Sequence, residues 1–301
     1  MRLFLLALLV SAAASAATLD EAKKAAPRAD LTGLTDAQAT VFLQVAGDVE
    51  NYAGCQGTLL KCLDAKVKDP HAVRMADLVA HFARLDAPAQ VITNFVEKHY
   101  ASFDPKSRVQ LKEECPTLGK GPIAILEFSD YECTHCAKAV PVLDELVTKD
   151  RKGKAHLCAK YFPFSNHPRA RLASLCAEYA RAHGKFWQMH AKIFEHQEQL
   201  DDASLKSYAK ELGLNGDEML AQANAGKFDE VVEKSVRMGN IAGVDSTPTL
   251  FFDGRMNALP VLPWFLQFSV DDELQWQKEH GWKFAAAPPA KKAAAGRQAR
   301  K

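Results

Sequence analysis

The chain of 301 residues has almost no net charge and no long hydrophobic run. Its 38 Lys and Arg residues balance 37 Asp and Glu residues, which leaves a charge of +1 at pH 7. So small a charge creates no global field that would attract nucleic acid or an acidic substrate. The apolar run from Leu3 to Val10 is far shorter than the roughly 20 residues of a membrane-spanning helix. We therefore expect no nucleic-acid partner and no membrane span.

The first sixteen residues are typical of a secretory signal peptide. A basic residue at position 2 precedes the apolar run, and Ala14-Ser15-Ala16 provides an A-x-A cleavage site. An uncleaved apolar helix is the alternative interpretation. With a cleaved signal, the mature protein is expected in an oxidising compartment, the bacterial periplasm. The seven cysteines of the chain agree with this, because disulfides form and persist in such compartments.

Two of the cysteines form a CxxC pair, Cys133-Thr134-His135-Cys136, between an expected strand and an expected helix. The apolar, β-branched run Ile123–Phe128 predicts a buried strand. After the pair, apolar residues recur at the spacing of a helix. Free N–H groups and the helix dipole at such a helix start favour an anion, here the thiolate of Cys133. His135 can add positive charge or a hydrogen-bond donor.

Other uses of a CxxC pair lack the residues they need. Haem attachment requires a histidine directly after the second cysteine, where Ala137 stands. A structural zinc site requires a second ligand pair, and Cys55 and Cys62 have the wrong spacing for one. We therefore expect no metal and no cofactor, and a purely structural Cys133–Cys136 disulfide is the remaining alternative to a redox role.

The chain resembles the thioredoxin superfamily and, within it, the DsbA-type thiol:disulfide oxidoreductases. The resemblance is carried by the CxxC pair, by Glu127 six residues before it, and by Ser246-Thr247-Pro248-Thr249. Phe162–Phe164 and Gly184–His190 are similar to parts of the helical insertion of DsbA-type proteins. The resemblance covers roughly Cys115 to Trp282 and does not include the first third of the chain.

The resemblance implies an α/β thioredoxin-like fold with an inserted helical domain, preceded here by a small all-helical N-terminal module. It implies that Cys133 is the nucleophile, Cys136 the resolving thiol and Glu127 a buried acid that moves the proton of Cys136. His135 would stabilise the thiolate. Pro248 would be cis, and a substrate would contact the following residues: Thr134, Thr247 and Pro248.

The function that the resemblance implies is disulfide exchange with cysteine-containing client proteins. A membrane-bound or soluble redox partner would recycle the enzyme. His135, directly before the second cysteine, favours an oxidase, whereas Thr247 before the proline is frequent in reductases and isomerases. The alternative from another functional class is a binding protein, which would hold clients in the groove around Pro248 without using the dithiol.

The expected domains follow from composition and periodicity. Residues 17–34 read as a flexible leader, and 35–105 as the helical module. A linker, 106–121, leads to the thioredoxin-like domain, 122–282, with its helical insertion at about 165–242. The tail, 283–301, is basic and disordered by composition, and we expect it to be solvated rather than bound to a membrane.

The remaining cysteines are harder to pair. In one continuous helix the Cα atoms of Cys55 and Cys62 would lie about 10.5 Å apart, beyond the roughly 7 Å that a disulfide allows. Gly54 and Gly57 break the helix, so we favour a turn that brings the two cysteines together as a structural disulfide. Cys115 could pair or stand free, and the pairing of the last two, Cys158 and Cys176, is left open, with small core residues as the favoured reading.

Overall fold

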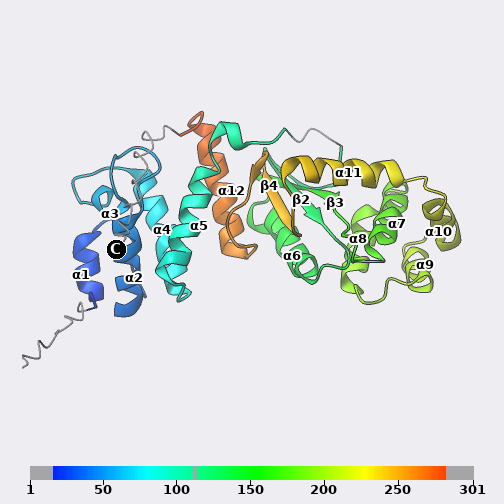
Figure 1. Ribbon diagram of the computed structural model, residues 1–301, viewed down its shortest axis with the longest axis horizontal. Coiled ribbons are helices and arrows are strands. Elements are labelled where there is room, and N and C mark those ends of the chain that lie inside the picture. Colours follow the sequence, from blue (N-terminus) through cyan, green and yellow to red (C-terminus); the bar gives the residue numbers. More distant parts are fainter. Residues whose placement is uncertain (1–15, 111–113, 283–301) are drawn as a thin grey trace, which may run out of the picture. The chain divides into compact units, whose positions relative to one another are not determined.

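The computed structural model describes residues 16–110 and 114–282 (Figure 1). The predicted signal peptide up to residue 15 and the predicted basic tail, 283–301, lie outside the described residues. The chain divides into two compact units, one formed by the residues up to Tyr100 together with Trp282, the other by Ala101–Gly281. Within the described ranges, no helix combines the length and the apolar character that crossing a bilayer demands.

The first unit is helical, as expected, but it begins earlier than the sequence suggested. Its helices are α1 (Leu19–Ala25), α2 (Asp36–Asp48), α3 (Leu59–Cys62), α4 (Pro70–Arg84) and α5 (Ala89–Ala101).

The flexible leader predicted for 17–34 is wrong, because α1 lies inside it. Thr18 and Glu21 form a reciprocal capping box at the start of α1. Ala22 and Ala26 are fully buried. The sequence of this segment shows no clear apolar periodicity, because its buried residues are small alanines. These alanines nevertheless form the buried face of α1 in the module.

The expected disulfide between Cys55 and Cys62 is confirmed, with their Cα atoms 5.8 Å apart. The chain turns at the two glycines, whose φ angles of +73° and +128° are ones that side chains rarely adopt. The buried Asp69 carboxylate accepts a hydrogen bond from the Cys55 N–H at 2.9 Å. The turn, the carboxylate and the disulfide together close the loop between α2 and α3.

The second unit is built on a five-stranded sheet of order β1-β3-β2-β4-β5. Strands β2 and β3 are parallel, and the other neighbouring pairs are antiparallel. The strands are β1 (Thr117–Lys120), β2 (Ile123–Ser129), β3 (Ala155–Tyr161), β4 (Thr249–Phe252) and β5 (Arg255–Met256). The predicted linker, 106–121, therefore contains the first strand of the sheet.

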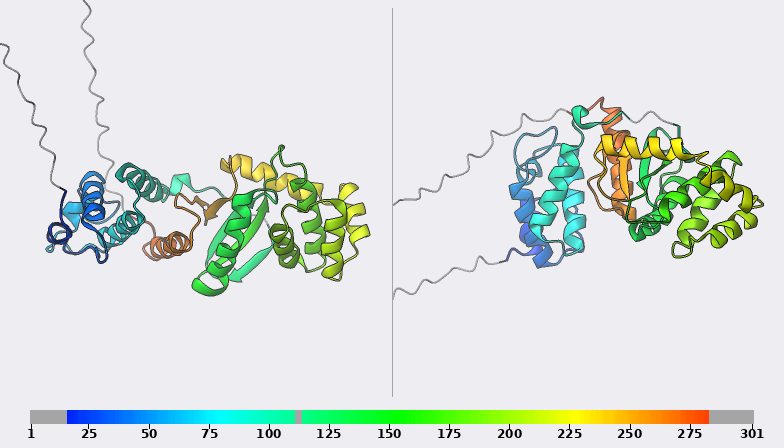
Figure 2. Two further views of the ribbon diagram at one scale, coloured as in Figure 1. Left: turned by 90° about the horizontal axis from the view of Figure 1, so that it is seen from below. Right: turned by 45° about the vertical axis from the view of Figure 1, so that its right-hand side comes forward.

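Helices cover both faces of this sheet, with α11 (Asp229–Ala242) on one side of the strands and α6 (Thr134–Glu145) on the other (Figures 1 and 2). Side chains of β2 alternate between the two faces. Ile123 and Ile125 pack with α6 and α12 (Pro263–Lys278), whereas Leu126 and Phe128 face α11. The remaining elements are η1 (Pro105–Ser107), η2 (Leu146–Asp150), α7 (Ala170–Ala182), α8 (Phe186–Glu195), α9 (Asp202–Glu211) and α10 (Gly216–Asn224).

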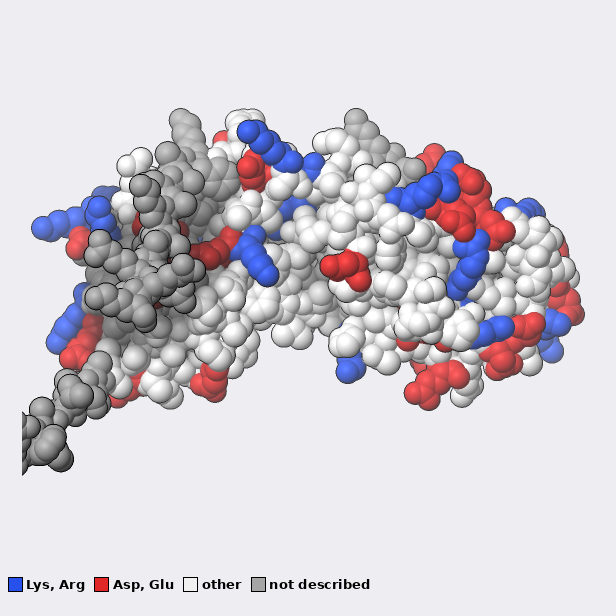
Figure 3. Space-filling view, viewed as in Figure 1, with Lys and Arg blue, Asp and Glu red and all other residues white. Residues whose placement is uncertain are grey.

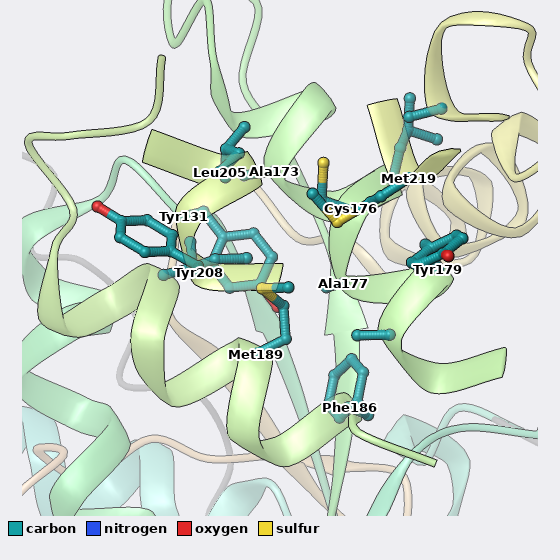
Figure 4. Close-up of a cluster of buried hydrophobic side chains, with 14 of the residues drawn as sticks. Tyr131, Ala173, Cys176, Ala177, Tyr179, Phe186, Met189, Leu205, Tyr208 and Met219 are labelled. Carbon is teal, nitrogen blue, oxygen red and sulfur yellow. The ribbon is translucent and has the colours of Figure 1, made fainter. Parts of the chain in front are cut away.

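Helices α7 to α11 form the helical insertion expected at about 165–242. Its apolar side chains, Cys176 and Met189 among them, form a cluster with Tyr131 from the loop before Cys133 (Figure 4). Cys176 is a fully buried free thiol, and burial raises its pKa to about 12. It is a small core residue, as the sequence suggested.

The surface of the insertion carries Lys, Arg, Asp and Glu side by side (Figure 3). Arg171 pairs with Asp229 and Glu233, and Arg237 pairs with Glu230. These partners are largely exposed, so each pair contributes little to stability. The mixing of signs agrees with the small net charge.

A buried charge cluster fixes the start of the second unit to its last helix. Glu273 of α12 pairs with Arg108 at 2.7 Å and with Arg255 of β5 at 2.9 Å. Arg255 and Glu273 are fully buried. The turn before β5 takes part as well, since the Gly254 carbonyl accepts the Val109 N–H at 2.9 Å, and a Cβ on Gly254 would meet the Val109 carbonyl at 2.2 Å. The segment after β4 is thus the place where residues 108–109 dock.

Candidate active site

The CxxC pair lies where β2 passes into α6. Cys133 is the N-cap of α6 and has extended backbone angles. Its N–H donates to the Asp130 carbonyl at 3.1 Å. Cys133 is partly exposed and Cys136 is fully buried. One sulfur is therefore open to a protein substrate, and the other lies beneath it in the first turn of the helix.

Thr247 and Pro248 face the exposed cysteine. Their peptide bond is cis, as the resemblance implied. The Cys133 thiol donates a hydrogen bond to the Thr247 carbonyl at 3.3 Å. Because 114 residues separate these two groups along the chain, the contact is a product of the fold and defines a single site.

Glu127 lies beneath the pair, fully buried in β2. By strand alternation its side chain shares the face of Ile123 and Ile125, the face that α6 covers. Neither carboxyl oxygen has a hydrogen-bond partner among the residues that the structure describes. Burial raises the pKa of Glu127 to about 7, and the nearby charge of Asp144 adds to this.

Cys136 shares this environment. Burial raises its pKa well above that of a free thiol, and the charge of Glu127 acts in the same direction. The two groups are therefore electrostatically coupled. A carboxyl that titrates near neutral pH beside a buried thiol is suited to accept and return the thiol proton.

The other predicted site residues fall into two groups. Thr134 and His135 are exposed on the first turn of α6 beside Cys133, and Thr247 and Pro248 are partly buried across from it. Cys55 and Cys62 belong to the helical module, where their sulfurs are bonded to each other. The structure thus gathers the CxxC residues, Glu127, Thr247 and Pro248 in the second unit.

Sequence reasoning missed the residues that hold the loop before Cys133. The buried Asp130 carboxylate accepts the Glu132 N–H at 2.7 Å, the Phe164 N–H at 2.8 Å and a hydrogen bond from His167 Nδ1 at 2.8 Å. Glu132 accepts the N–H groups of Arg169 and Ala170, at the start of α7, at 2.6 and 2.7 Å. The clue in the sequence was a pair of acids flanking Tyr131, but their partners lie more than thirty residues away.

Tyr131 ties the same loop to the insertion. Its hydroxyl lies 3.0 Å from His190 Nδ1, and its carbonyl accepts a hydrogen bond from Gln197 at 2.9 Å. Burial lowers the pKa of His190 to about 3, so this histidine is neutral at ordinary pH. The helical insertion therefore positions the segment that carries Cys133.

Known proteins are similar to the second unit in sequence and in fold. The thioredoxin family model matches residues 119–263. Among solved structures, BdbD from Bacillus subtilis in its oxidised form is 24% identical with a TM-score of 0.50, over 54% of this chain and 93% of that one. A thioredoxin-like oxidoreductase from Silicibacter pomeroyi is 21% identical with a TM-score of 0.49, over 58% of this chain and 96% of that one.

Curated relatives match a stretch of the chain of similar length. The Na(+)/H(+) antiporter NhaA 3 of Salinispora tropica is 33% identical over 142 residues, which is 47% of this chain and 22% of the relative. The chain thus spans about a fifth of the length of the curated relatives it matches. The sheet order, the CxxC pair at the start of α6 and the cis proline give the second unit a thioredoxin-like, DsbA-like fold, and residues 119–263 match the thioredoxin family model.

Proposed function

We propose that this protein is a periplasmic thiol:disulfide oxidoreductase that exchanges disulfides with client proteins through Cys133 and Cys136, and that it acts as an oxidase. The observation that carries the proposal is the placement of a partly exposed Cys133 at the first turn of α6, 3.3 Å from the carbonyl that precedes cis-Pro248. The signal-like N-terminus supports the periplasmic location. The chemistry requires no cofactor, because electrons pass through sulfur.

In the oxidising direction, the enzyme begins with a Cys133–Cys136 disulfide. A client thiolate attacks Cys133 Sγ, and the electron pair of the broken bond goes to Cys136. A second client thiolate then attacks the client sulfur of the mixed disulfide and releases Cys133 as a thiolate. The client gains a disulfide, and the enzyme is left as a dithiol for a redox partner to reoxidise.

The buried residues Glu127 and Cys136 exchange the proton that this reaction requires. Cys136 leaves as a thiolate in a buried position, where burial favours the protonated thiol. Glu127, with its pKa near 7, supplies that proton and takes it back on reoxidation. Thr134 and Thr247 lie on either side of Cys133 and provide the surface for an extended client segment.

Replacing Cys136 with alanine is expected to trap clients. In this variant the Cys133 thiolate attacks a client disulfide and forms a mixed disulfide, with the other client cysteine leaving as a thiolate. Because Cys136 is absent and cannot resolve it, the mixed disulfide accumulates. Non-reducing gels and mass spectrometry of the purified Cys136→Ala variant should show client adducts that a reductant releases. The double variant Cys133→Ala/Cys136→Ala is the matched control and should carry none. Adduct-free Cys136→Ala from oxidising cells would favour the alternative of a client-binding protein with an idle dithiol.

The reduction potential of the Cys133–Cys136 pair decides between oxidase and reductase. An oxidase of the DsbA kind should equilibrate with glutathione near about −120 mV, whereas a thioredoxin-like reductant lies near about −270 mV. If His135 stabilises the reduced enzyme, His135→Ala should lower the potential by tens of millivolts, about 30 mV for each 1.4 kcal/mol lost. A reduction potential near about −270 mV that does not change in His135→Ala would mean that Thr247, rather than His135, indicates the function. The protein would then be a reductase or isomerase.

A further inference from the structure

Ser129 is a buried hydroxyl at the end of β2, on the same face of the sheet as Glu127. Residues two apart in a strand point to the same side, so the two side chains are neighbours along one face. The Ser129 carbonyl accepts the Phe162 N–H at 2.8 Å, and its side chain is only 7% exposed. The Cys158 sulfur, which is bonded to Cys115 rather than free, lies on the opposite face beneath α11. The hydroxyl therefore belongs to the environment of the CxxC pair.

Helix α6 places Cys136 over the same end of the strand. Ile125, in the first half of β2, shares an apolar cluster with Leu143, near the end of the helix. The helix therefore runs back along the strand, and its first turn, with the fully buried Cys136, lies over the last residues of β2. Along this direction the side chain of Ser129 comes between Cys136 and Glu127.

No hydrogen bond joins Glu127 directly to Cys136. Neither carboxyl oxygen has a hydrogen-bond partner among the residues that the structure describes, and the Ser129 hydroxyl makes no hydrogen bond of normal geometry with them either. Buried polar groups without partners are costly, so a small rotation that lets the hydroxyl bond to its neighbours is favourable. A proton that moves between the carboxyl and the thiol thus needs a group between them.

The Ser129 hydroxyl acts on both ends of this proton transfer. Burial raises the pKa of Glu127 and that of Cys136, and the Ser129 hydroxyl lowers both, as a donor within reach of each anion does. The charge of Asp144 adds to the effect of burial on Glu127. Thr247 contributes another hydroxyl near Cys136, but it lies on the segment before β4 and not on the strand that carries Glu127.

We propose that Ser129 carries the proton between Glu127 and Cys136 during disulfide exchange, a role that rests on the proposed function. When a client thiolate breaks the Cys133–Cys136 bond, Cys136 Sγ takes the electron pair and the Ser129 hydroxyl gives it a proton. The hydroxyl takes a proton from the Glu127 carboxyl in return, because a hydroxyl can donate and accept at once. Glu127 is left as a carboxylate and Ser129 is unchanged. Reoxidation runs the same transfers in reverse.

Glutathione disulfide separates the step that needs this proton transfer from the step that does not. Mixed with the reduced protein in excess, it forms a mixed disulfide with Cys133, which Cys136 then resolves once it has lost its proton. Acid quenching and mass spectrometry measure the rates of both steps. Ser129→Ala should slow resolution roughly 100-fold, the lower end of the usual effect of general acid–base catalysis, and leave formation unchanged. Resolution at the native rate in Ser129→Ala would overturn the proposal.

Three further variants distinguish a relay from a structural role. Ser129→Thr keeps the hydroxyl and should restore most of the resolution rate. Ser174→Ala removes a hydroxyl that is buried in α7 and bonded to the Ala170 carbonyl at 2.9 Å, and both rates should stay native. Glu127→Gln combined with Ser129→Ala should be no slower than either single variant, because the two residues act as a unit. Additive slowing, or a Ser129→Thr as slow as Ser129→Ala, would contradict the relay.

The pH profile of resolution gives a readout that a loss of packing would not change. In the native protein the rate should level off above about pH 7, where Glu127 has become the carboxylate that accepts the proton. In Ser129→Ala only solvent can take the proton, so the rate should continue to rise with pH. A native-like plateau in Ser129→Ala would overturn the relay.

The two proposals fail in different ways. A native protein that forms no adduct at Cys133 with glutathione disulfide would contradict the exchange function and the relay together. Native formation with unaltered resolution in Ser129→Ala would overturn the relay alone. A protein that shows the expected rates with glutathione disulfide but traps no client in the Cys136→Ala experiment would keep the relay and lose the role in client oxidation.

Discussion

Replacing Glu273 with alanine is expected to destabilise the second unit by about 3–5 kcal/mol, the usual result of removing one partner from a buried ion pair. Glu273 lies between two guanidinium groups, those of Arg108 and Arg255, at 2.7 and 2.9 Å. Arg255 is fully buried, and without the carboxylate its charge loses its salt-bridge partner and keeps only the weaker attraction of Asp272. Urea unfolding followed by tryptophan fluorescence measures the change.

The same helix offers a control for the Glu273 experiment. Asp271 pairs with Arg151 at 2.6 Å, but their side chains remain 30% and 18% exposed. Asp271→Ala should therefore cost no more than about 1 kcal/mol. The loss of stability in Glu273→Ala could instead be as small as that in Asp271→Ala. The cluster would then be held without the carboxylate by two cation–π contacts near 4 Å, Arg255 with Phe103 and Arg108 with Trp276.

The strand, the CxxC pair and the helix of the candidate site could be predicted because their signals are local. A β-branched run, a CxxC pair and a helical period follow one another within about twenty residues, and each predicts its own element. The cis Thr247–Pro248 bond was different, since it depended on the resemblance to a family. Residue propensity alone makes a cis X-Pro bond uncommon.

The rest of the site depends on long-range partners that no local pattern reveals. Asp130 was an unremarked acid in the sequence, yet its carboxylate binds a histidine 37 residues further along. The Cys115–Cys158 pair was left open for the same reason, because 43 residues separate the two cysteines and only the register of β1 on β3 brings them together. The buried role of Arg255 likewise depends on a distant partner, Glu273, which lies 18 residues further along the chain.

Replacing Glu127 with glutamine is expected to remove a pH dependence of stability worth about 3 kcal/mol. The pKa of Glu127 is raised from 4.5 to about 7 in the folded protein. Between these values the native state holds a proton that the unfolded chain has lost, so stability falls as the pH rises from about 4.5 to about 7. At 1.36 kcal/mol per pH unit, the full loss is about 3 kcal/mol. The free energy of unfolding, measured in urea at pH 4 and pH 8 for both proteins, tests this.

The decisive quantity is the difference between the two proteins and how it changes with pH. A buried glutamine amide also lacks partners, but its cost is the same at every pH, so it cancels when the two pH values are compared. The stability of Glu127→Gln relative to the native protein should therefore be higher at pH 8 than at pH 4. The control is Glu145→Gln, which removes an exposed carboxyl paired with Lys149. It should change the free energy of unfolding by less than about 1 kcal/mol at either pH. A Glu127→Gln difference that is constant with pH would mean that Glu127 does not hold a proton near neutrality in the folded protein. It would then be unable to serve the buried thiol of Cys136 as a proton donor, and the proton of the exchange reaction would have to come from solvent through the opening around Cys133.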